Sequence, residues 1–276
     1  MYREWAPDHR VTGRVTCAWA SETGSATTKL VVPDGCVDLI WGPRGMHVAG
    51  PDTGPKPVTM APDERYVGVR FRCGSAGDVF GVPLSDLRDL RVPLAELGPL
   101  TGLSTLEALV TGAGDRSPDA VATTMQRALA LRLRSVPGPD PAAPVIARAL
   151  LAGRSVAEVA WDLGLGERQL LRRTLQIFGY GPKVLQRVVR FQRALRLARN
   201  GVPASEVAVT SGYADQSHMA NEVRRLAGVP LGRLAGSSSE DVPEHGEAGV
   251  RTSSRARPNS VNRARSAERV SSVSGT

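Results

Sequence analysis

The chain has 276 residues, of which 41% are hydrophobic and 22% charged, and its formal net charge is +8. This composition supports a sizeable core and excludes a collagen-like repeat, wholesale disorder and a pure coiled coil. No stretch approaches the roughly 20 apolar residues that span a bilayer, and the N-terminus has no apolar segment of the signal-peptide type. We therefore expect a soluble, intracellular protein.

Short runs rich in β-forming residues, separated by turn residues, fill the first 100 positions. They lie at 28–32, 36–41, 47–49, 58–60 and 66–71. Asp34-Gly35 between the first two runs predicts a hairpin, although the proline before it weakens a strict two-residue turn. Val67, Val69 and Phe71 alternate and predict one buried face. We expect an all-β barrel or sandwich here.

The periodicity becomes helical after residue 83. Leucines at helical spacing predict short helices over 84–90 and 104–110, and Ser117-Pro118 predicts the start of a helix that continues to about residue 134. The predicted buried stripe of this last helix consists of Val121, Met125, Leu129 and Leu133. Helices 84–90 and 117–134 are candidates both for dimerisation and for simple core.

Composition divides the chain further. Residues 136–143 are rich in proline and glycine, which fit neither a helix nor a central strand, so we place a linker there. Residues 236–276 have too little apolar mass to order themselves and predict a disordered Ser/Arg-rich tail. The predicted fold is therefore α+β with two domains: a β-rich sensor or dimerisation domain at 1–135 and an all-α domain at 144–235.

The positive charge is concentrated in the predicted all-α domain. Residues 144–235 carry 14 Lys and Arg, 13 of them Arg, against 6 Asp and Glu, whereas residues 1–143 are close to neutral. Arginine suits bidentate contacts with phosphate and guanine. Such a concentrated basic segment is typical of a protein that binds a polyanion.

The basic segment contains one pattern twice. Superposing 156–160 on 204–208 brings Gly164 onto Gly212 without a gap, 48 residues apart. Each copy predicts a short helix, a turn and a second helix, because glycine adopts the positive φ of the turn and a buried alanine lets the helices pack closely. Residues 182–200 predict one helix between the copies, about 27–30 Å long, close to one DNA turn of ~34 Å. Two helix-turn-helix motifs could thus enter successive major grooves.

Residues 150–234 resemble the DNA-binding domain of the AraC/XylS family of transcriptional regulators. The resemblance lies in residues 155–160, 168–173, 178–183, 193–197, 212–218 and 228–231. Residues 32–40 and 68–72 resemble an uncharacterised, cupin-like sensor domain that often precedes this DNA-binding domain in bacterial regulators. The resemblance implies a sequence-specific transcription regulator, not an enzyme, in the cytoplasm of a bacterium and associated with the nucleoid.

The resemblance also implies partners and contact residues. Double-stranded DNA is the principal partner, and the further candidates are a small-molecule effector, RNA polymerase and a second copy of the chain. No membrane, cofactor or metal is implied. By position, the candidate DNA-contacting residues are Arg168, Leu171, Arg172, Arg173, Gln216, Ser217, His218 and Asn221, each of which could instead be plain surface. Met219 and Val223 stand where the family usually has Phe, and we expect looser packing of that second recognition helix.

Asp34, Cys36 and Asp38 alternate along a predicted strand and are candidates for an effector pocket. The alternative is a turn-stabilising Asp34 and a core Cys36. Two other functions stay open: a nonspecific basic DNA-binding or architectural protein, and an alkylation sensor of the Ada type. The Ada-type chemistry needs four clustered thiolates, whereas this chain has three dispersed cysteines.

Overall fold

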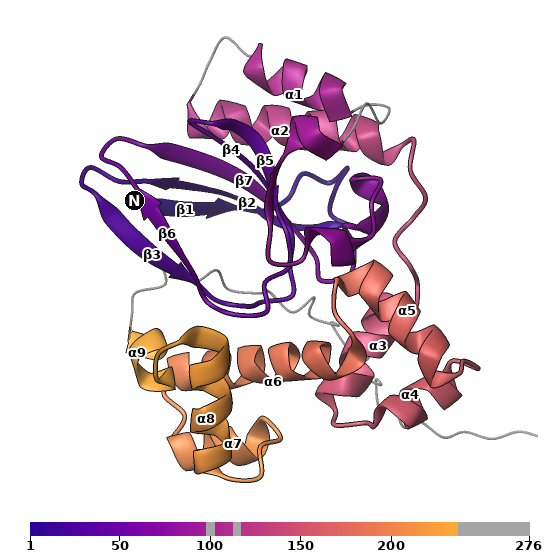
Figure 1. Cartoon of the computed structure of the whole chain (residues 1–276). Coiled ribbons are helices and arrows are strands. Elements are labelled where there is room, and N and C mark those ends of the chain that lie inside the picture. Colours follow the sequence, from indigo (N-terminus) through magenta and orange to yellow (C-terminus); the bar gives the residue numbers. More distant parts are fainter. Residues whose placement is uncertain (98–102, 113–116, 237–276) are drawn as a thin grey trace, which may run out of the picture. The chain divides into compact units, whose positions relative to one another are not determined.

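The structure is a computed structural model that describes residues 1–97, 103–112 and 117–236. Its N-terminal part is β-rich and its C-terminal part is helical (Figure 1). The predicted α+β class with a β-rich part followed by an all-α part is confirmed. The exact domain boundaries stay predictions, and the tail predicted at 236–276 lies, beyond Gly236, outside the described residues.

Six antiparallel strands form the main sheet, in the order β1-β2-β7-β4-β5-β8. In that order they are Tyr2–Trp5, Val15–Glu22, Arg65–Phe71, Asp38–Gly42, Gly45–Ala49 and Arg91–Pro93. A separate two-stranded sheet pairs β3 (Thr27–Val31) with β6 (Lys56–Met60). Val67, Val69 and Phe71 on the central strand β7 are fully buried, as their alternation predicts.

The predicted hairpin around Asp34-Gly35 is wrong. Gly35 does adopt a positive φ of 77°, but the strands on either side belong to different sheets. Strand β3 pairs with β6, whereas β4 pairs with β5 and β7. The chain leaves β3 at Val32, whose buried side chain packs among the C-terminal helices, so the connection crosses between sheets instead of folding back.

Strands β1 and β2 were not predicted from the sequence. Strand β2 reads VTCAWASE, and its buried residues do not alternate strictly along the strand. Ala18 and Ala20 in its middle are small and weak β-formers, which explains the missing signal. Its neighbour β1 is an edge strand of four residues, paired only with β2 among the described strands.

Two helices complete the core of the β-rich part. They are α1 (Leu103–Thr111) and α2 (Pro118–Leu133), and α2 packs on β2 and β7. Ser117 caps α2 as predicted, because its Oγ accepts a hydrogen bond from the backbone N–H of Ala120 at 3.3 Å. Three of the four predicted stripe residues are buried, and Leu133 is half-buried. The segment 84–90 forms only a 3-10 helix at Leu84–Leu87, flanked along the chain by 3-10 turns at Gly77–Val79 and Leu94–Leu97.

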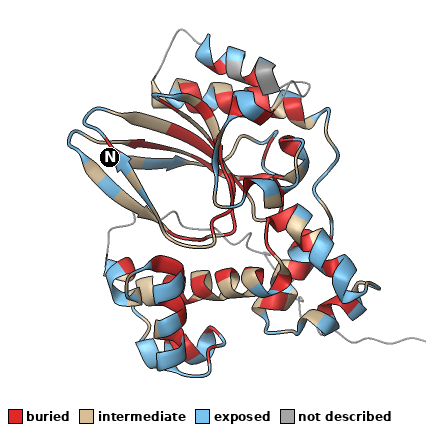
Figure 2. Ribbon diagram, viewed as in Figure 1, coloured by how far each residue is buried: buried red, intermediate tan, exposed pale blue. Residues whose placement is uncertain are grey.

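The C-terminal part consists of seven helices in the described chain. They are α3 (Ala143–Leu151), α4 (Val156–Asp162), α5 (Glu167–Phe178), α6 (Pro182–Arg199), α7 (Ala204–Thr210), α8 (Gln216–Ala227) and α9 (Leu231–Gly236). Helix α6 serves two cores: Leu185 and Val188 pack with α3–α5, whereas Phe191 and Leu195 pack with α7–α9. Figure 2 shows buried residues along this helix. No helix among the described residues is long and apolar enough to cross a membrane.

Candidate DNA-binding surface and candidate effector cavity

The two helix-turn-helix units have the same turn geometry. Gly164 and Gly212 adopt positive φ values of 65° and 81°, as predicted. The residue after each glycine donates its backbone N–H to the carbonyl of a buried alanine in the first helix of the unit. This bond joins Leu165 to Ala160 at 2.8 Å and Tyr213 to Ala208 at 2.9 Å. The equivalence at 48 residues therefore extends from the sequence to individual hydrogen bonds.

After the turn, the two units are equivalent at a spacing of 49 residues. Helices α5 and α8 both have 12 residues, and each ends at a glycine of positive φ. The buried positions match at this spacing: Leu170, Thr174, Ile177 and Phe178 in α5 correspond to Met219, Val223, Leu226 and Ala227 in α8. The second turn thus contains one extra residue. Met219 and Val223 are buried as fully as their counterparts, so the expected looser packing is not found.

Helix α5 presents Arg168, Leu171 and Arg172 to solvent. Both arginines are exposed, and the Leu171 side chain is 44% exposed although it is apolar. Residues 168 and 172 lie four apart and therefore share one face of the helix. The buried residues of α5 hold the opposite face against the core, so this face can contact a partner without unpacking the helix.

Arg173 points differently from its neighbour Arg172. Its guanidinium makes two hydrogen bonds to the carboxylate of Asp140, with Nε–Oδ2 and Nη2–Oδ1 distances of 2.7 and 2.6 Å. At the spacing of 49 its counterpart is Glu222, which is buried and also ion-paired. Arg173 could reach DNA only by leaving this ion pair.

Helix α8 presents Gln216, Ser217 and Asn221 to solvent. His218 is also exposed, but it takes part in the helix start: its backbone N–H donates to the Asp215 carboxylate at 2.7 Å, and its Nδ1 accepts from the N–H of Ala214 at 3.3 Å. Its ring packs edge-on against the Tyr213 ring, with the centroids 5.5 Å apart. The structure thus gives His218 a local structural role.

Ion pairs fix α8 against the long helix α6. Glu222 on α8 is 7% exposed and accepts from Arg187 Nε at 2.9 Å and from Arg190 Nη2 at 3.4 Å. Arg190 also donates to the carbonyl of Gly212 at 3.2 Å, and its guanidinium lies 4.7 Å from the centroid of the Tyr213 ring. These two arginines of the basic segment therefore hold the second unit together.

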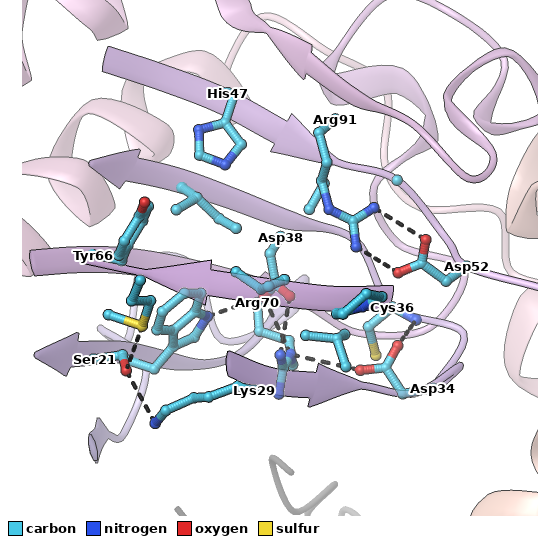
Figure 3. Close-up of a pocket in the computed structure, with 18 of the residues that line it drawn as sticks. Ser21, Lys29, Asp34, Cys36, Asp38, His47, Asp52, Tyr66, Arg70 and Arg91 are labelled. Carbon is cyan, nitrogen blue, oxygen red and sulfur yellow. Dashed lines mark hydrogen bonds and ion pairs between the residues drawn. The ribbon is translucent and has the colours of Figure 1, made fainter. Parts of the chain in front are cut away.

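The β-rich part contains a cavity of about 560 Å³ between its two sheets, which is open to solvent on one side (Figure 3). Asp34, Cys36 and Asp38 all line it, although only Asp38 belongs to a strand and the other two precede β4. Aromatic and aliphatic side chains from both sheets form the walls, among them Trp19, Ile40, Val58, Met60 and Tyr66.

Two ion pairs lie in this cavity. Arg70 on β7 donates from Nε and Nη2 to the carboxylate of Asp38 at 3.1 and 3.0 Å, and its Nε lies 3.9 Å from Asp34 Oδ2. Arg91 makes two hydrogen bonds to Asp52 at 3.0 and 2.6 Å. Burial raises the pKa of Asp52 above its ordinary value, although the hydrogen bonds from Arg91 act in the opposite direction.

The loops that line the cavity also contact the helical part. The carbonyl of Asp52 accepts a hydrogen bond at 2.5 Å from the hydroxyl of Tyr180, a buried residue between α5 and α6. The carbonyl of Pro33, next to Asp34, accepts from the Gln192 side chain on α6 at 2.6 Å. Each cavity loop is therefore hydrogen-bonded directly to the helical part: the loop at Asp52 to the residue between α5 and α6, and the loop at Pro33 to α6.

Comparison with known families agrees with this geometry. A model described as a helix-turn-helix domain, of the AraC type, matches residues 159–236. The C-terminal part is an AraC-type helix-turn-helix domain. Such a domain is typical of DNA-binding transcription regulators. A domain of unknown function, DUF6597, matches residues 3–93, which include every residue that lines the cavity except Tyr2.

Solved structures similar to this chain include three of ToxT from Vibrio cholerae. An apo form of a single-residue ToxT variant from strain SCE256 is 12% identical, with 79% of this chain and 96% of that chain covered and a TM-score of 0.44. ToxT from strain O395 is 10% identical, with 78% and 95% covered and a TM-score of 0.41. Wild-type ToxT bound to an unsaturated fatty acid is 11% identical, with 78% and 93% covered and a TM-score of 0.41. No curated protein matches the chain.

Several residues at these two sites were not singled out from the sequence. Arg224 and Arg225 extend the exposed side of α8 in the AraC-type domain, and their spacing of three and four from Asn221 was the available signal. In the cavity, Arg70 and Arg91 were missed because their carboxylate partners lie more than 30 positions away in the sequence. No local spacing marks such pairs.

Proposed function

We propose that this chain regulates transcription by binding a specific DNA sequence with α5 and α8 in successive major grooves. Arg168, Leu171 and Arg172 read the first groove, and Gln216, Ser217 and Asn221 read the second. Arginine can contact guanine or phosphate, and glutamine or asparagine can read adenine. Arg173 and His218, whose side chains have intramolecular partners, stabilise the helices that form this contact surface.

The observation that carries this proposal is the structural repetition of the two units. Each has the same turn hydrogen bond, a recognition helix of 12 residues and an exposed face opposite the buried one. The 18 residues of α6 between them span about 27 Å at 1.5 Å per residue, against a DNA helical turn of about 34 Å. That separation supports entry of both recognition helices into successive major grooves on one face of the duplex.

We further propose that the cavity of residues 2–93 holds a small-molecule effector. The two cavity loops, at Pro33-Asp34 and at Asp52, each carry a carbonyl that is hydrogen-bonded to the helical part. A ligand that favours one arrangement of these loops would favour one arrangement of the recognition helices, because both arrangements are coupled through the same bonds. The proposed domain division is a sensor at 1–135, a linker at 136–143 and a DNA-binding domain at 144–235.

We place the regulator in the bacterial cytoplasm with its DNA. RNA polymerase is a further proposed partner, since an operator-bound regulator acts through the polymerase. A second copy of the chain is another, since α1 and α2 expose the apolar side chains of Leu109 and Leu131.

Selection from a pool of random duplexes by the full chain, at about 150 mM salt, tests the proposal. The expected result is an enriched sequence with two elements about one helical turn apart. The double variant Arg172→Ala with Asn221→Ala should abolish the enrichment, whereas the control Arg127→Ala, an exposed arginine on α2, should leave it unchanged. Retention of DNA without any enrichment would instead favour the nonspecific basic DNA-binding protein.

A further inference from the structure

The sequence beyond the helical part contains a repeat of six residues. From residue 251 the pattern Arg-x-x-Ser-x-x occurs four times in succession without a gap. A repeat at a fixed period indicates one unit that is used several times, so arginine and serine at this spacing belong together. The repeats lie outside the described residues. Their arginines and serines are Arg251, Arg257, Arg263 and Arg269, and Ser254, Ser260, Ser266 and Ser272.

The repeats are strongly basic. Residues 250–276 contain six Arg and a single acidic residue, Glu268, which gives this segment a net charge of +5. Arginine donates charge-assisted hydrogen bonds to phosphate oxygens, and the serine hydroxyl donates to the same oxygens. Each repeat therefore offers a phosphate backbone one cation and one hydroxyl donor.

A stretch of opposite charge precedes the repeats. Residues 237–249 contain four acidic residues and neither Lys nor Arg. DNA phosphates repel this stretch, so the repeats are the part of the sequence beyond α9 that DNA attracts. Arg251 follows Gly236 by fifteen residues, a length of chain that spans at most about 50 Å. That reach exceeds one DNA turn of about 34 Å, so phosphates beside the two grooves lie within range of the repeats.

The described structure ends on the second helix-turn-helix unit. Helix α9 packs against α8 and α6, with Leu234 buried in the core that these helices share. The chain therefore leaves α9 at Gly236 from the unit whose recognition helix is α8. Three arginines of α8 and α9 are exposed and form no ion pair with any described residue. They are Arg224, Arg225 and Arg233.

We propose that the four repeats bind the phosphate backbone of DNA on the flank of the sequence that α5 and α8 read. This inference rests on the proposed DNA binding of the AraC-type domain. Once that domain is bound, the repeats meet the flanking phosphates as part of the same molecule, which raises their effective concentration. They add affinity without adding sequence choice, because phosphate contacts carry no base information.

The salt dependence of DNA binding by the full chain tests the proposal. The variant combines Arg251→Gln, Arg257→Gln, Arg263→Gln and Arg269→Gln, and the control has the corresponding Arg→Lys changes, which keep the charge. Each neutralised phosphate contributes about 0.9 to the slope of log K against log salt concentration. On a random duplex of about 40 base pairs, we expect the glutamine variant to lose about 2 or more of this slope and the lysine control to keep it.

A second control tests net charge alone. Arg44→Gln, Arg127→Gln and Arg134→Gln together remove three exposed arginines from the β-rich part. This triple variant should change the slope by less than about 1. A smaller loss of slope in the glutamine variant than expected, or a similar loss in this triple variant, would overturn the proposal. The first of these results would instead favour pairing of the repeats with the acidic stretch at 237–249.

A comparison of two duplexes separates phosphate contacts from base readout. The glutamine variant should bind the selected and the scrambled duplex more weakly by the same factor, about tenfold or more at about 150 mM salt. A loss confined to the selected duplex would refute the phosphate assignment. If selection from random duplexes enriches no sequence, the proposed function fails, whereas the slope on random DNA still decides the role of the repeats.

Discussion

Arg172 and Arg173 are adjacent arginines on α5, and the structure predicts opposite consequences for their replacement by alanine. Arg172 is exposed, so its loss should change the free energy of unfolding by no more than about 0.5 kcal/mol. If it reads a base, the same change should weaken binding to the selected duplex by roughly 1–3 kcal/mol, which is about 5- to 150-fold.

Arg173→Ala should act on stability. Arg173 and Asp140 side chains are 33% and 25% exposed, so their pair contributes about 0.5–1 kcal/mol after solvent screening. The hydrogen bonds from Arg173 lower the pKa of Asp140 below its ordinary 3.8. The folded state therefore favours the ionised carboxylate, and this stabilisation is present above pH 3.8 and is lost as the pH falls through the lowered pKa. The difference in stability between wild type and Arg173→Ala should shrink in the same acid range.

Fluorescence anisotropy with the selected duplex and a scrambled duplex, together with urea unfolding at several pH values, measures both effects. Arg127→Ala, on the β-rich part, controls for the loss of one positive charge. Greater loss of specific binding in Arg173→Ala than in Arg172→Ala would refute the assignment of faces on α5. If Arg172→Ala lost the same affinity for both duplexes, Arg172 would contact phosphate and not a base.

Three further predictions concern packing. Gly50→Ala should lower the free energy of unfolding, measured in urea, by about 3 kcal/mol, because a Cβ there would lie 1.7 Å from the carbonyl oxygen of Leu87. The control Gly13→Ala, at a position with open space around it, should lower it by less than about 1 kcal/mol. Tyr180→Phe should cost about 1–2 kcal/mol by removing the buried hydroxyl that donates to a cavity loop, and an unchanged unfolding midpoint would contradict that bond. Burial raises the pKa of the Cys36 thiol well above its usual value, so a disulfide reagent at about pH 8 should modify it only after unfolding.

The helix-turn-helix units were predictable because their signals are local. Gly164 and Gly212 mark turns within a few residues of the alanines they bond to, and helical periodicity assigns the buried faces. What the pattern did not reveal is the extra residue in the second turn. It shifts the equivalence from 48 to 49, so that Arg172 corresponds to Asn221 and Arg173 to Glu222.

The pairing of strands was predicted less well because it depends on distant residues. A turn at Asp34-Gly35 is a local property, and the structure contains it. Whether the flanking strands pair with each other depends on Val32, which is buried among the C-terminal helices more than 150 residues away. The alternation of Val67 and Phe71 correctly predicted a buried face of the strand. It could not predict the partner strand, because alternation tells which side chains share a face and not which strand lies alongside.

The cavity residues show the same difference. Residues close together along the chain were predicted from the sequence, whereas their partner on a distant strand was not. Asp34 and Asp38 could be selected as pocket residues because their spacing puts polar groups on one side of a short segment. Their electrostatic meaning depends on Arg70, which reaches them only because β7 pairs with β4 in the register that places Asp38 opposite Arg70. Without that register the carboxylates would suggest a site for a cation. With it, Arg70 donates two hydrogen bonds to Asp38 and lies 3.9 Å from Asp34, so a guanidinium of the protein itself already faces these carboxylates.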